Sequence, residues 1–287
     1  MTAKLSNLDK LYWPKITKGE LLHYYETVAP AILPYLKNRP LVMVRFPNGI
    51  NGEHFYQKEA GANLPKFVKT TSIQHEERKI SYILVQNLQT LLYVVNLGSI
   101  ELHVFNAPIS HLEKPDYMVF DLDPEAIPFK AVVETAQVVH EILEEIKVPS
   151  FCKTSGASGL HIYVPLQGKY TYEQEVQFAK LVAHKAQERL PGIVSLERRP
   201  VNRQKKVYID VFQNNEMQTL ASAYSVRAQP NATVSTPLSW KEVKSGLDPR
   251  DFTIKTVPNR LKKGDPFKGV LGKGANLQAA LKKLEKI

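Results

Sequence analysis

The sequence contains almost no cysteine and no hydrophobic run long enough to cross a lipid bilayer. Its single cysteine, Cys152, cannot form an internal disulfide, and one thiolate cannot supply a zinc cluster. The longest apolar runs, such as Leu91–Val95, are far too short for a transmembrane helix. The first residues lack the apolar segment of a secretory signal, so we expect a cytoplasmic protein. These absences exclude disulfide-rich secreted scaffolds and zinc ribbons.

What is present is an ordinary globular composition with an excess of positive charge. The chain has 287 residues, of which 43% are hydrophobic and 23% charged, and this composition excludes a wholly disordered chain. Lys and Arg number 38 against 28 Asp and Glu, so the formal net charge is +10. Residues 255–287 hold nine basic and two acidic residues, and therefore +7 of that charge. Such a basic extension is typical of a solubility device or of binding to a polyanion, most simply a nucleic acid.

Hydrophobic periodicity predicts a mixture of helices and strands. A capping-box pattern at Thr17 and Glu20 predicts a helix that continues to Pro34. Apolar residues at helical spacing predict two more helices, over Phe129–Ile146 and Thr171–Leu190. Strands are expected over Leu41–Phe46, Ile100–Phe105, Tyr117–Leu122, Phe151–Lys153, Leu160–Val164 and Val207–Phe212. No long linker separates these elements, so we predict one domain over 1–287 of the α+β class, with a basic C-terminal extension at about 255–287.

Two aspartates near the end of one predicted strand are the most informative polar residues. Asp121 and Asp123 are two positions apart, so both side chains lie on the same face of the strand. Two like charges repel unless a cation lies between them, and carboxylate oxygens are the ligands that Mg²⁺ and Mn²⁺ prefer. Asp210, in another predicted strand, is a candidate third ligand. Three such acids fit a two-metal site for phosphoryl transfer, although Asp-x-Asp-Pro alone is also typical of a polar turn.

Several other residues are candidates for binding phosphate. The loop Ser155–Gly159 joins two predicted strands through small residues, so its amides can approach an anion closely and Ser155 can donate its hydroxyl. His161 follows the loop and can reach the same anion, although a flexible loop with an incidental histidine would look alike. The loop lacks the Gly-Lys-Ser/Thr ending of a Walker A motif. Arg203 and Arg227 are candidate clamps for a triphosphate because the guanidinium fork matches phosphate oxygens.

The combined motifs resemble the polymerase domain of the bacterial and archaeal ligase D of non-homologous end joining, a member of the archaeo-eukaryotic primase superfamily. The main matches are Asp121–Pro124, Lys153–His161 and Ile209–Asp210. Supporting matches are Asp9–Lys10, Tyr12–Pro14, Thr17–Lys18, Arg45–Gly49, Phe55–Lys58, Glu101–His103, Ala223–Arg227 and Gly264–Phe267. They follow the family's order over nearly the whole chain, so the joint pattern is specific although each piece is not. The resemblance implies a primase-like fold with central mixed and antiparallel sheets flanked by helices.

The resemblance also implies roles for residues at the reaction itself. Three acids resemble the family's catalytic and metal-binding triad, namely Asp121, Asp123 and Asp210. The residues that resemble contacts to the incoming nucleotide are Ser155, His161, Arg203, Arg227 and His103. Within that group, His103 resembles a residue beside the nucleotide sugar or the primer terminus, a role that its spacing alone does not decide.

A second set of residues resembles the family's contacts to DNA. Phe55 and Tyr56 resemble an aromatic pair against which a template base stacks. Lys10 and Lys18 resemble a pocket for the 5′-phosphate of the downstream strand. Arg45 resembles a further nucleic-acid contact.

Similarity to this family implies an enzyme that adds nucleotides, preferably ribonucleotides, to 3′ ends at DNA breaks and gaps. The implied cofactors are two Mn²⁺ or Mg²⁺ ions. The implied partners are DNA with broken or gapped ends and a 5′-phosphate, nucleoside triphosphates, a DNA ligase and a Ku-type end-binding protein, in a nucleoid-associated setting and without a membrane. Two alternatives stay open, a non-catalytic module that binds or bridges DNA ends and a two-metal nuclease. Intact acids at all three positions argue against the first, whereas a nuclease would also use paired acids.

Overall fold

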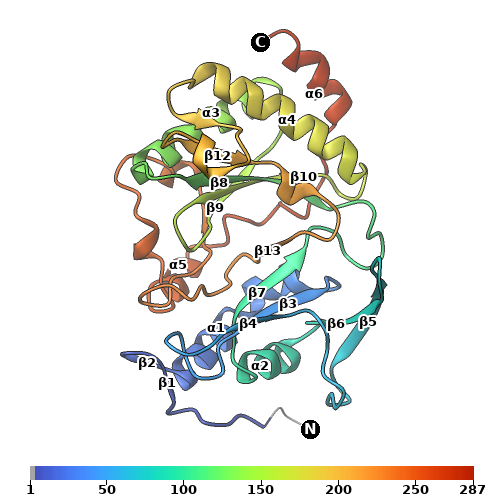
Figure 1. Ribbon diagram of the computed structural model, residues 1–287, viewed down its shortest axis with the longest axis vertical. Helices are drawn as coiled ribbons and strands as arrows, with labels where there is room; N and C mark the ends of the chain where they lie inside the picture. Colours follow the sequence, from blue (N-terminus) through green and yellow to red (C-terminus); the bar gives the residue numbers. More distant parts are fainter. Residues whose placement is uncertain (1–3) are drawn as a thin grey trace. The chain divides into compact units, whose positions relative to one another are not determined.

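A computed structural model describes residues 4–287, and its strands fall into four sheets (Figure 1). The chain divides into two units, each assembled from segments that are separated in the sequence. Unit 1 comprises the residues up to Ser110, Thr219–Thr236 and Arg250–Asp265, and unit 2 comprises His111–Gln218, Pro237–Pro249 and Pro266–Ile287. The basic extension over 255–287 is therefore shared between the units. The single domain over 1–287 stays a prediction.

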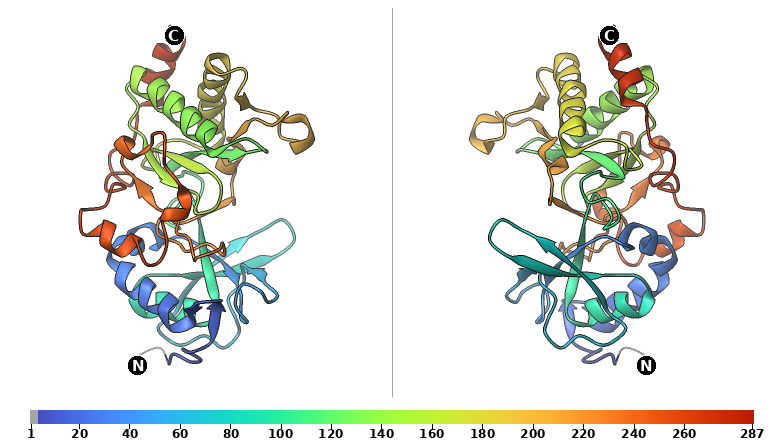
Figure 2. Two further views of the ribbon diagram at one scale, coloured as in Figure 1. Left: turned by 90° about the vertical axis from the view of Figure 1, so that its left-hand side faces the viewer. Right: turned by 90° about the vertical axis from the view of Figure 1, so that its right-hand side faces the viewer.

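Unit 1 is built around a four-stranded antiparallel sheet and a long helix. The sheet has the order β13-β7-β3-β4. The helix α1 (Lys18–Leu36) begins at the predicted capping box, in which the Thr17 side chain accepts from the Glu20 amide and Glu20 Oε2 accepts from the Thr17 amide. The other elements of the unit are β1 (Leu11–Trp13), β2 (Ile16–Thr17), β3 (Leu41–Arg45), β4 (Phe55–Gln57), β5 (Lys69–Gln74), β6 (Lys79–Leu84), α2 (Leu88–Asn96), β7 (Ser99–Phe105), β13 (Thr219–Ala221) and α5 (Val257–Leu261). In Figure 2 the β5–β6 hairpin projects away from the rest of this unit.

Unit 2 contains a six-stranded sheet of order β11-β12-β8-β10-β9-β14, with α3 and α4 packed on one face (Figures 1 and 2). Only β11 and β12 pair in parallel. The elements are β8 (Tyr117–Pro124), α3 (Phe129–Glu145), β9 (Phe151–Thr154), β10 (Leu160–Pro165), α4 (Tyr172–Arg189), β11 (Val194–Ser195), β12 (Val207–Asp210), β14 (Pro237–Leu238) and α6 (Leu277–Leu284). Short 3₁₀ helices η1 (Pro200–Asn202), η2 (Phe212–Asn214), η3 (Trp240–Glu242) and η4 (Pro249–Asp251) lie in the connections, with η4 at the boundary of the two units.

The predicted α+β class is confirmed, and the predicted helices over 129–146 and 171–190 lie within a residue of α3 and α4. The strand predicted over Val207–Phe212 ends earlier, at Asp210. The cause is local, because the Asp210 carboxylate accepts a hydrogen bond from the Phe212 amide, which turns the chain into η2. This early end leaves Asp210 as the last residue of its strand.

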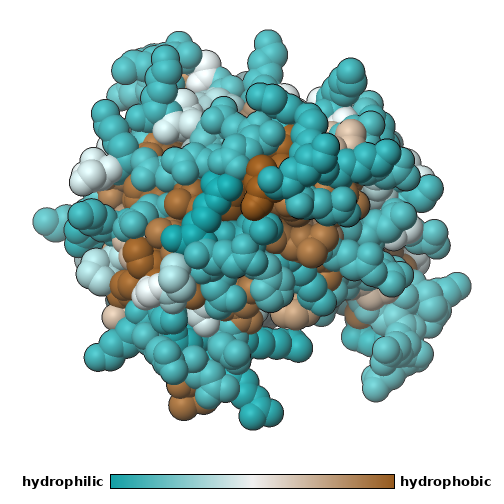
Figure 3. All heavy atoms as spheres, turned by 90° about the horizontal axis from the view of Figure 1, so that it is seen from above, coloured by the Kyte–Doolittle hydropathy of each residue, from teal (hydrophilic) through white to brown (hydrophobic). Residues whose placement is uncertain are grey.

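Apolar side chains fill the interior of each unit, and hydrophilic ones cover the surface. In unit 2, Phe120, Leu122, Val132 and Val139 are fully buried, in agreement with the apolar spacing of their elements. The face shown in Figure 3 is mostly hydrophilic, and hydrophobic side chains show only in small areas between polar ones. Within residues 4–287, every helix is too short or too polar to span a membrane.

Candidate active site

Four polar side chains form a row across the six-stranded sheet of unit 2. The strand register places Asp210 of β12 opposite Asp121 of β8. It also places Asp121 opposite His161 of β10, and His161 opposite Lys153 of β9. Residues directly opposite each other on antiparallel strands project from the same face, with Cβ atoms about 4.5–5.5 Å apart. We call Asp210, Asp121, His161 and Lys153 the polar row.

Asp123 shares the face of the polar row because it lies two residues beyond Asp121 on β8. The three acids singled out in the sequence thus lie on one face of two adjacent strands. Burial raises the pKa of Asp210, and the nearby charge of Asp121 acts in the same direction. This repulsion between like charges is the electrostatic cost that a divalent cation would remove.

The three carboxylates suit a hard cation in their chemistry and in their strand register. Among residues 4–287, however, no group of three or more His, Cys, Asp or Glu side chains is arranged to hold a metal ion. Asp210 instead accepts hydrogen bonds from the Phe212 amide at 2.8 Å and from Gln213 Nε2 at 3.2 Å, and its Oδ1 lies 3.4 Å from the Tyr208 hydroxyl. A carboxylate has about four acceptor sites on its two oxygens, so these hydrogen bonds orient Asp210 but leave it able to bind an ion as well.

In the polar row, His161 places a nitrogen atom beside Asp121, and Lys153 places one beside His161. His161 Nε2 lies 3.1 Å from Asp121 Oδ1. On the other side of the imidazole ring, Lys153 Nζ lies 2.9 Å from His161 Nδ1. All three residues are buried, so these charges interact in a medium of low effective dielectric constant.

The small-residue loop between β9 and β10 lies beside the acids. A side chain at Gly159 would collide with the carbonyl oxygen of Leu122, and its Cβ would lie 3.5 Å from Asp123 Oδ1. Only glycine therefore permits the loop to approach β8 this closely. Ser155 Oγ accepts hydrogen bonds from the amides of Ala157 and Gly159 at 3.1 and 3.0 Å, which holds the loop in shape.

Arg203 is held by contacts to its own loop, to Tyr208 of β12 and to Glu125, whose Oε2 lies 3.5 Å from the guanidinium. Its guanidinium stacks over the Tyr208 ring at 3.9 Å, and Tyr208 lies opposite Asp123 in the sheet. The same guanidinium donates to the carbonyls of Glu197 and Arg198. Burial and the charge of Asp210 raise the pKa of Tyr208 to about 12, so its hydroxyl stays protonated at neutral pH.

In unit 1, the carboxylate of Glu101 joins His103 and Arg227. Glu101 Oε2 lies 2.8 Å from His103 Nε2 and 3.0 Å from Arg227 Nε, and Oε1 accepts from the Ala228 amide at 3.0 Å. Burial alone would raise the pKa of Glu101, but the hydrogen bond from His103 and the charge of Arg227 outweigh it and lower the pKa to about 2. The sequence therefore brings His103 and Arg227 together through a buried anion.

Two lysines of unit 1 also come together. Lys10 Nζ donates to the Pro47 carbonyl at 2.8 Å and to Asn48 Oδ1 at 2.6 Å, and Lys18 Nζ donates to the Ser6 carbonyl at 2.8 Å. Burial lowers the pKa of Lys18, and the charge of Lys10 lowers it further. Two neighbouring positive charges favour an anion such as phosphate, so the predicted role of the two lysines stays a prediction.

The predicted aromatic pair lies on the edge strand β4. Phe55 is 44% exposed and Tyr56 is 66% exposed. Neighbouring residues of a strand point to opposite faces, and accordingly Phe55 contacts the guanidinium of Arg45 while the Tyr56 ring lies 6.5 Å from that of His103. Arg45 also donates to the Leu97 carbonyl and to Gln57, so it supports Phe55 from inside the unit.

Sequence reasoning gave no role to two of these residues, Glu101 and Lys153. Glu101 lies two positions from His103 on a strand, which places both on one face and is a usable signal. Lys153 lies between Cys152 and Thr154 in a short, fully buried segment, and only the register of β9 with β10 brings it to His161. No local pattern reveals such a pairing.

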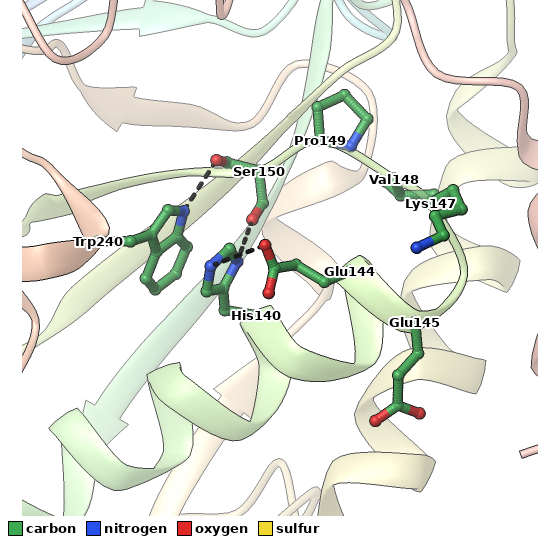
Figure 4. Close-up of a pocket in the computed structure, with 8 residues that line it drawn as sticks. All are labelled: His140, Glu144, Glu145, Lys147, Val148, Pro149, Ser150 and Trp240. Carbon is green, nitrogen blue, oxygen red and sulfur yellow. Dashed lines mark hydrogen bonds and ion pairs between the residues drawn. The ribbon is translucent and has the colours of Figure 1, made fainter.

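A separate open pocket of about 780 Å³ occurs elsewhere in unit 2, and none of the predicted site residues lines it (Figure 4). In this pocket the His140 ring stacks on Trp240 with a centroid distance of 3.7 Å, and His140 Nδ1 lies 2.9 Å from Ser150 Oγ. The Trp240 indole donates to the Ser150 carbonyl. The polar groups of His140, Ser150 and Trp240 thus form hydrogen bonds with one another in the pocket wall.

Comparison with known proteins gives consistent matches over most of the chain. Residues 17–267 match the family described as LigD, primase-polymerase domain. The chain is 35% identical over 269 residues to the bifunctional non-homologous end joining protein LigD of Bacillus subtilis, covering 92% of this chain and 43% of that protein. It is 31% identical over 288 residues to the multifunctional non-homologous end joining protein LigD of Pseudomonas aeruginosa, covering 98% of this chain and 34% of that protein.

A solved structure is also similar. It is described as the polymerase domain from Mycobacterium tuberculosis ligase D in complex with DNA, and it superposes with a TM-score of 0.88 at 26% sequence identity. The similarity covers 95% of this chain and 99% of that chain. The chain thus corresponds to a whole domain there, whereas it spans less than half the length of the two curated relatives.

Proposed function

Because the chain belongs to the LigD primase-polymerase family, we propose that it adds nucleotides to 3′ ends at DNA breaks and gaps during non-homologous end joining. The family membership confirms the resemblance inferred from the motifs. The observation that carries the proposal is the set of three carboxylates on one face of β8 and β12, beside a small-residue loop and His161. We further propose a preference for ribonucleotides.

The proposed reaction joins the primer to the α-phosphate of the incoming nucleotide. The 3′-hydroxyl loses its proton to solvent, its oxygen forms a bond to the α-phosphorus, and the bond from that phosphorus to the pyrophosphate oxygen breaks, so that pyrophosphate leaves. Two Mg²⁺ or Mn²⁺ ions, held by Asp121 and Asp123 together with Asp210, would supply charge that favours the deprotonated hydroxyl and the leaving pyrophosphate. The amides of the Ser155–Gly159 loop, His161 and Arg203 would bind the triphosphate oxygens.

Residues of unit 1 would bind the substrates. Arg227 and His103, held by Glu101, are proposed contacts to the triphosphate and to the sugar or primer terminus. The exposed ring of Tyr56 and that of Phe55 would stack on template bases, and the Lys10 and Lys18 pocket would bind a 5′-phosphate. A DNA ligase and a Ku-type end-binding protein are the proposed partners in repair.

The direct test is a double substitution, Asp121→Ala with Asp123→Ala, assayed by primer extension with Mn²⁺ and ribonucleotides. We expect extension to fall to background, because two of three proposed metal ligands are lost, while binding to gapped DNA persists. Glu216→Ala, at an exposed position of the same unit, is the matched control and should extend normally. Near-normal extension by the double variant would refute the proposed active site.

The same assay separates the two alternatives. A non-catalytic end-binding module would bind ends in EDTA and would incorporate no nucleotide in the wild-type protein under any metal condition. A two-metal nuclease would shorten labelled ends in the presence of metal and without added nucleotides. Either result for the wild-type protein would replace the polymerase proposal.

A further inference from the structure

We propose that Lys153 is a positioning residue that fixes the tautomer of His161, with the imidazole proton on Nε2. This inference deepens the proposed function, since it states how His161 meets a phosphate group. It concerns the chain's own side chains and can be tested without metal, nucleotide or DNA.

The geometry of the polar row carries the argument. Lys153 is 0% exposed, and its position on β9 lies directly opposite His161 on β10. Its Nζ lies 2.9 Å from His161 Nδ1 and 5.6 Å from the centroid of the Tyr163 ring. The ammonium is thus held between an imidazole nitrogen and an aromatic face, both of which favour a cation.

The donor inventory of the two side chains then sets the tautomer. A lysine ammonium has three donors and no acceptor, so Nδ1 of His161 must accept. A neutral imidazole that accepts at Nδ1 carries its proton at Nε2. Nε2 is the atom that lies 3.1 Å from Asp121 Oδ1. The histidine therefore presents an N–H to the acids, and not a lone pair.

This choice of tautomer matters for phosphate binding. An N–H at Nε2 can donate to a carboxylate or to a triphosphate oxygen, whereas the other tautomer would present a lone pair to the same anions and repel them. Lys153 thereby determines whether His161 Nε2 attracts or repels an anion, although Lys153 itself does not contact the substrate. Its charge also lies at the end of the polar row, where it offsets the mutual repulsion of Asp121 and Asp210.

The primary test is the nitrogen spectrum of the histidine side chains. The protein has eight histidines, so two-bond ¹H–¹⁵N correlations of ¹⁵N-histidine protein resolve each ring, and His161→Gln assigns the signal of interest. We expect wild-type His161 to show a protonated Nε2 and an unprotonated Nδ1. A protonated Nδ1 in the wild-type spectrum would overturn the proposal, since Lys153 would then not be the donor.

Substitutions at Lys153 test the cause. Lys153→Met keeps the unbranched stem but removes the donors, so the His161 signals should move toward a mixture of the two tautomers, although Asp121 still accepts from Nε2. Lys153→Arg restores donors and should restore the wild-type pattern. Unchanged His161 signals in a folded Lys153→Met protein would refute the role, and if that variant does not fold, the wild-type and Lys153→Arg spectra still decide.

Kinetics provide the readout in function. Lys153→Met should raise the KM for the nucleotide by about tenfold, the loss of one hydrogen bond to a charged group, with a smaller change in kcat. Lys130→Met, an exposed residue of α3, is the matched control. A polymerase-negative wild-type protein with the expected histidine spectrum would disprove the proposed function but leave the Lys153 assignment standing.

Discussion

At the residue scale, the carboxylate of Glu101 is a group whose surroundings change its chemistry strongly. It faces His103, Arg227 and the Ala228 amide from a buried position on β7. Those contacts hold its pKa at about 2, against 4.5 for an ordinary glutamate. A group of this kind ties two proposed substrate-binding residues, His103 and Arg227, to the stability of the unit that carries them.

The variant Glu101→Gln should be less stable than wild type at neutral pH, by up to about 3 kcal/mol. Since the folded pKa lies below the unfolded one, the contribution of Glu101 is complete above about pH 4.5 and is lost as the pH falls toward 2. Urea unfolding measured from pH 7 to pH 3 should therefore show a difference in the free energy of unfolding between wild type and variant that becomes smaller below about pH 4.5. Glu77→Gln, at an exposed position of unit 1, should show no such trend. A gap that is constant with pH would contradict the assigned contacts.

Lys10 and Lys18 allow a second prediction at this scale, because the charge of Lys10 adds to burial in lowering the pKa of Lys18 and a bound anion would offset that repulsion. If they bind the 5′-phosphate, gapped DNA with that phosphate should bind more tightly than the same DNA without it. Each neutralised phosphate adds about 0.9 to the slope of log K against log salt, so Lys10→Ala with Lys18→Ala should reduce the slope. Fluorescence anisotropy over a salt series measures this, with Lys15→Ala as the control. Equal slopes for the double variant and wild type would remove the two lysines from the pocket.

At the element scale, the first turn of α4 contains a buried glutamate, Glu175, for which the helix residues Tyr172–Arg189 supply no hydrogen-bond donor. Glu175 lies in the first turn after the Thr171 cap, and among the residues that the structure describes neither of its carboxyl oxygens has a hydrogen-bond partner. Burial raises its pKa well above the ordinary value, because it disfavours the charged carboxylate. Burial thus outweighs the favourable field of the helix start.

Replacing Glu175 with Gln should stabilise the protein at pH 8. The pKa of Glu175 is higher in the folded protein than in the unfolded chain. The wild-type protein therefore loses stability as the pH rises from the unfolded pKa through the folded one. The variant lacks this loss, so the difference in Tm should be larger at pH 8 than at pH 5. Glu173→Gln, exposed on the same turn, serves as the reference. If Glu175→Gln is less stable than wild type at pH 8, an interaction of the carboxylate outweighs its burial.

Elements with local signals were predictable from the sequence, and pairings between distant segments were not. The capping box at Thr17 and the apolar spacing of α3 gave the helices, because those signals depend on near neighbours. Side chains alternate between the two faces of a strand, and this alternation correctly predicted that Asp121 and Asp123 lie on the same face of β8. The alignment of Asp210, Asp121, His161 and Lys153 depends on the register of four strands, which no short pattern encodes.

At the scale of the whole molecule, the division into two units was not visible in the sequence. The boundaries at Ser110–His111 and Gln218–Thr219 lie in short connections between strands, over 106–116 and 211–218, that resemble ordinary loops and so do not identify a boundary in the sequence. The return of Thr219–Ala221 to pair with β7 is a contact over more than a hundred residues, and such contacts carry no local signature. The roles of the residues at the proposed site rest on family resemblance and on geometry, and they stay predictions.

The interleaved path of the chain has a consequence for dissection by truncation. Unit 1 takes its last segments from Thr219–Thr236 and Arg250–Asp265, and unit 2 takes its own from Pro237–Pro249 and Pro266–Ile287. No contiguous fragment therefore holds one complete unit without also carrying pieces of the other. A premature stop after Gln218 would remove β13 from unit 1 and both β14 and α6 from unit 2, so a single truncation would damage both units.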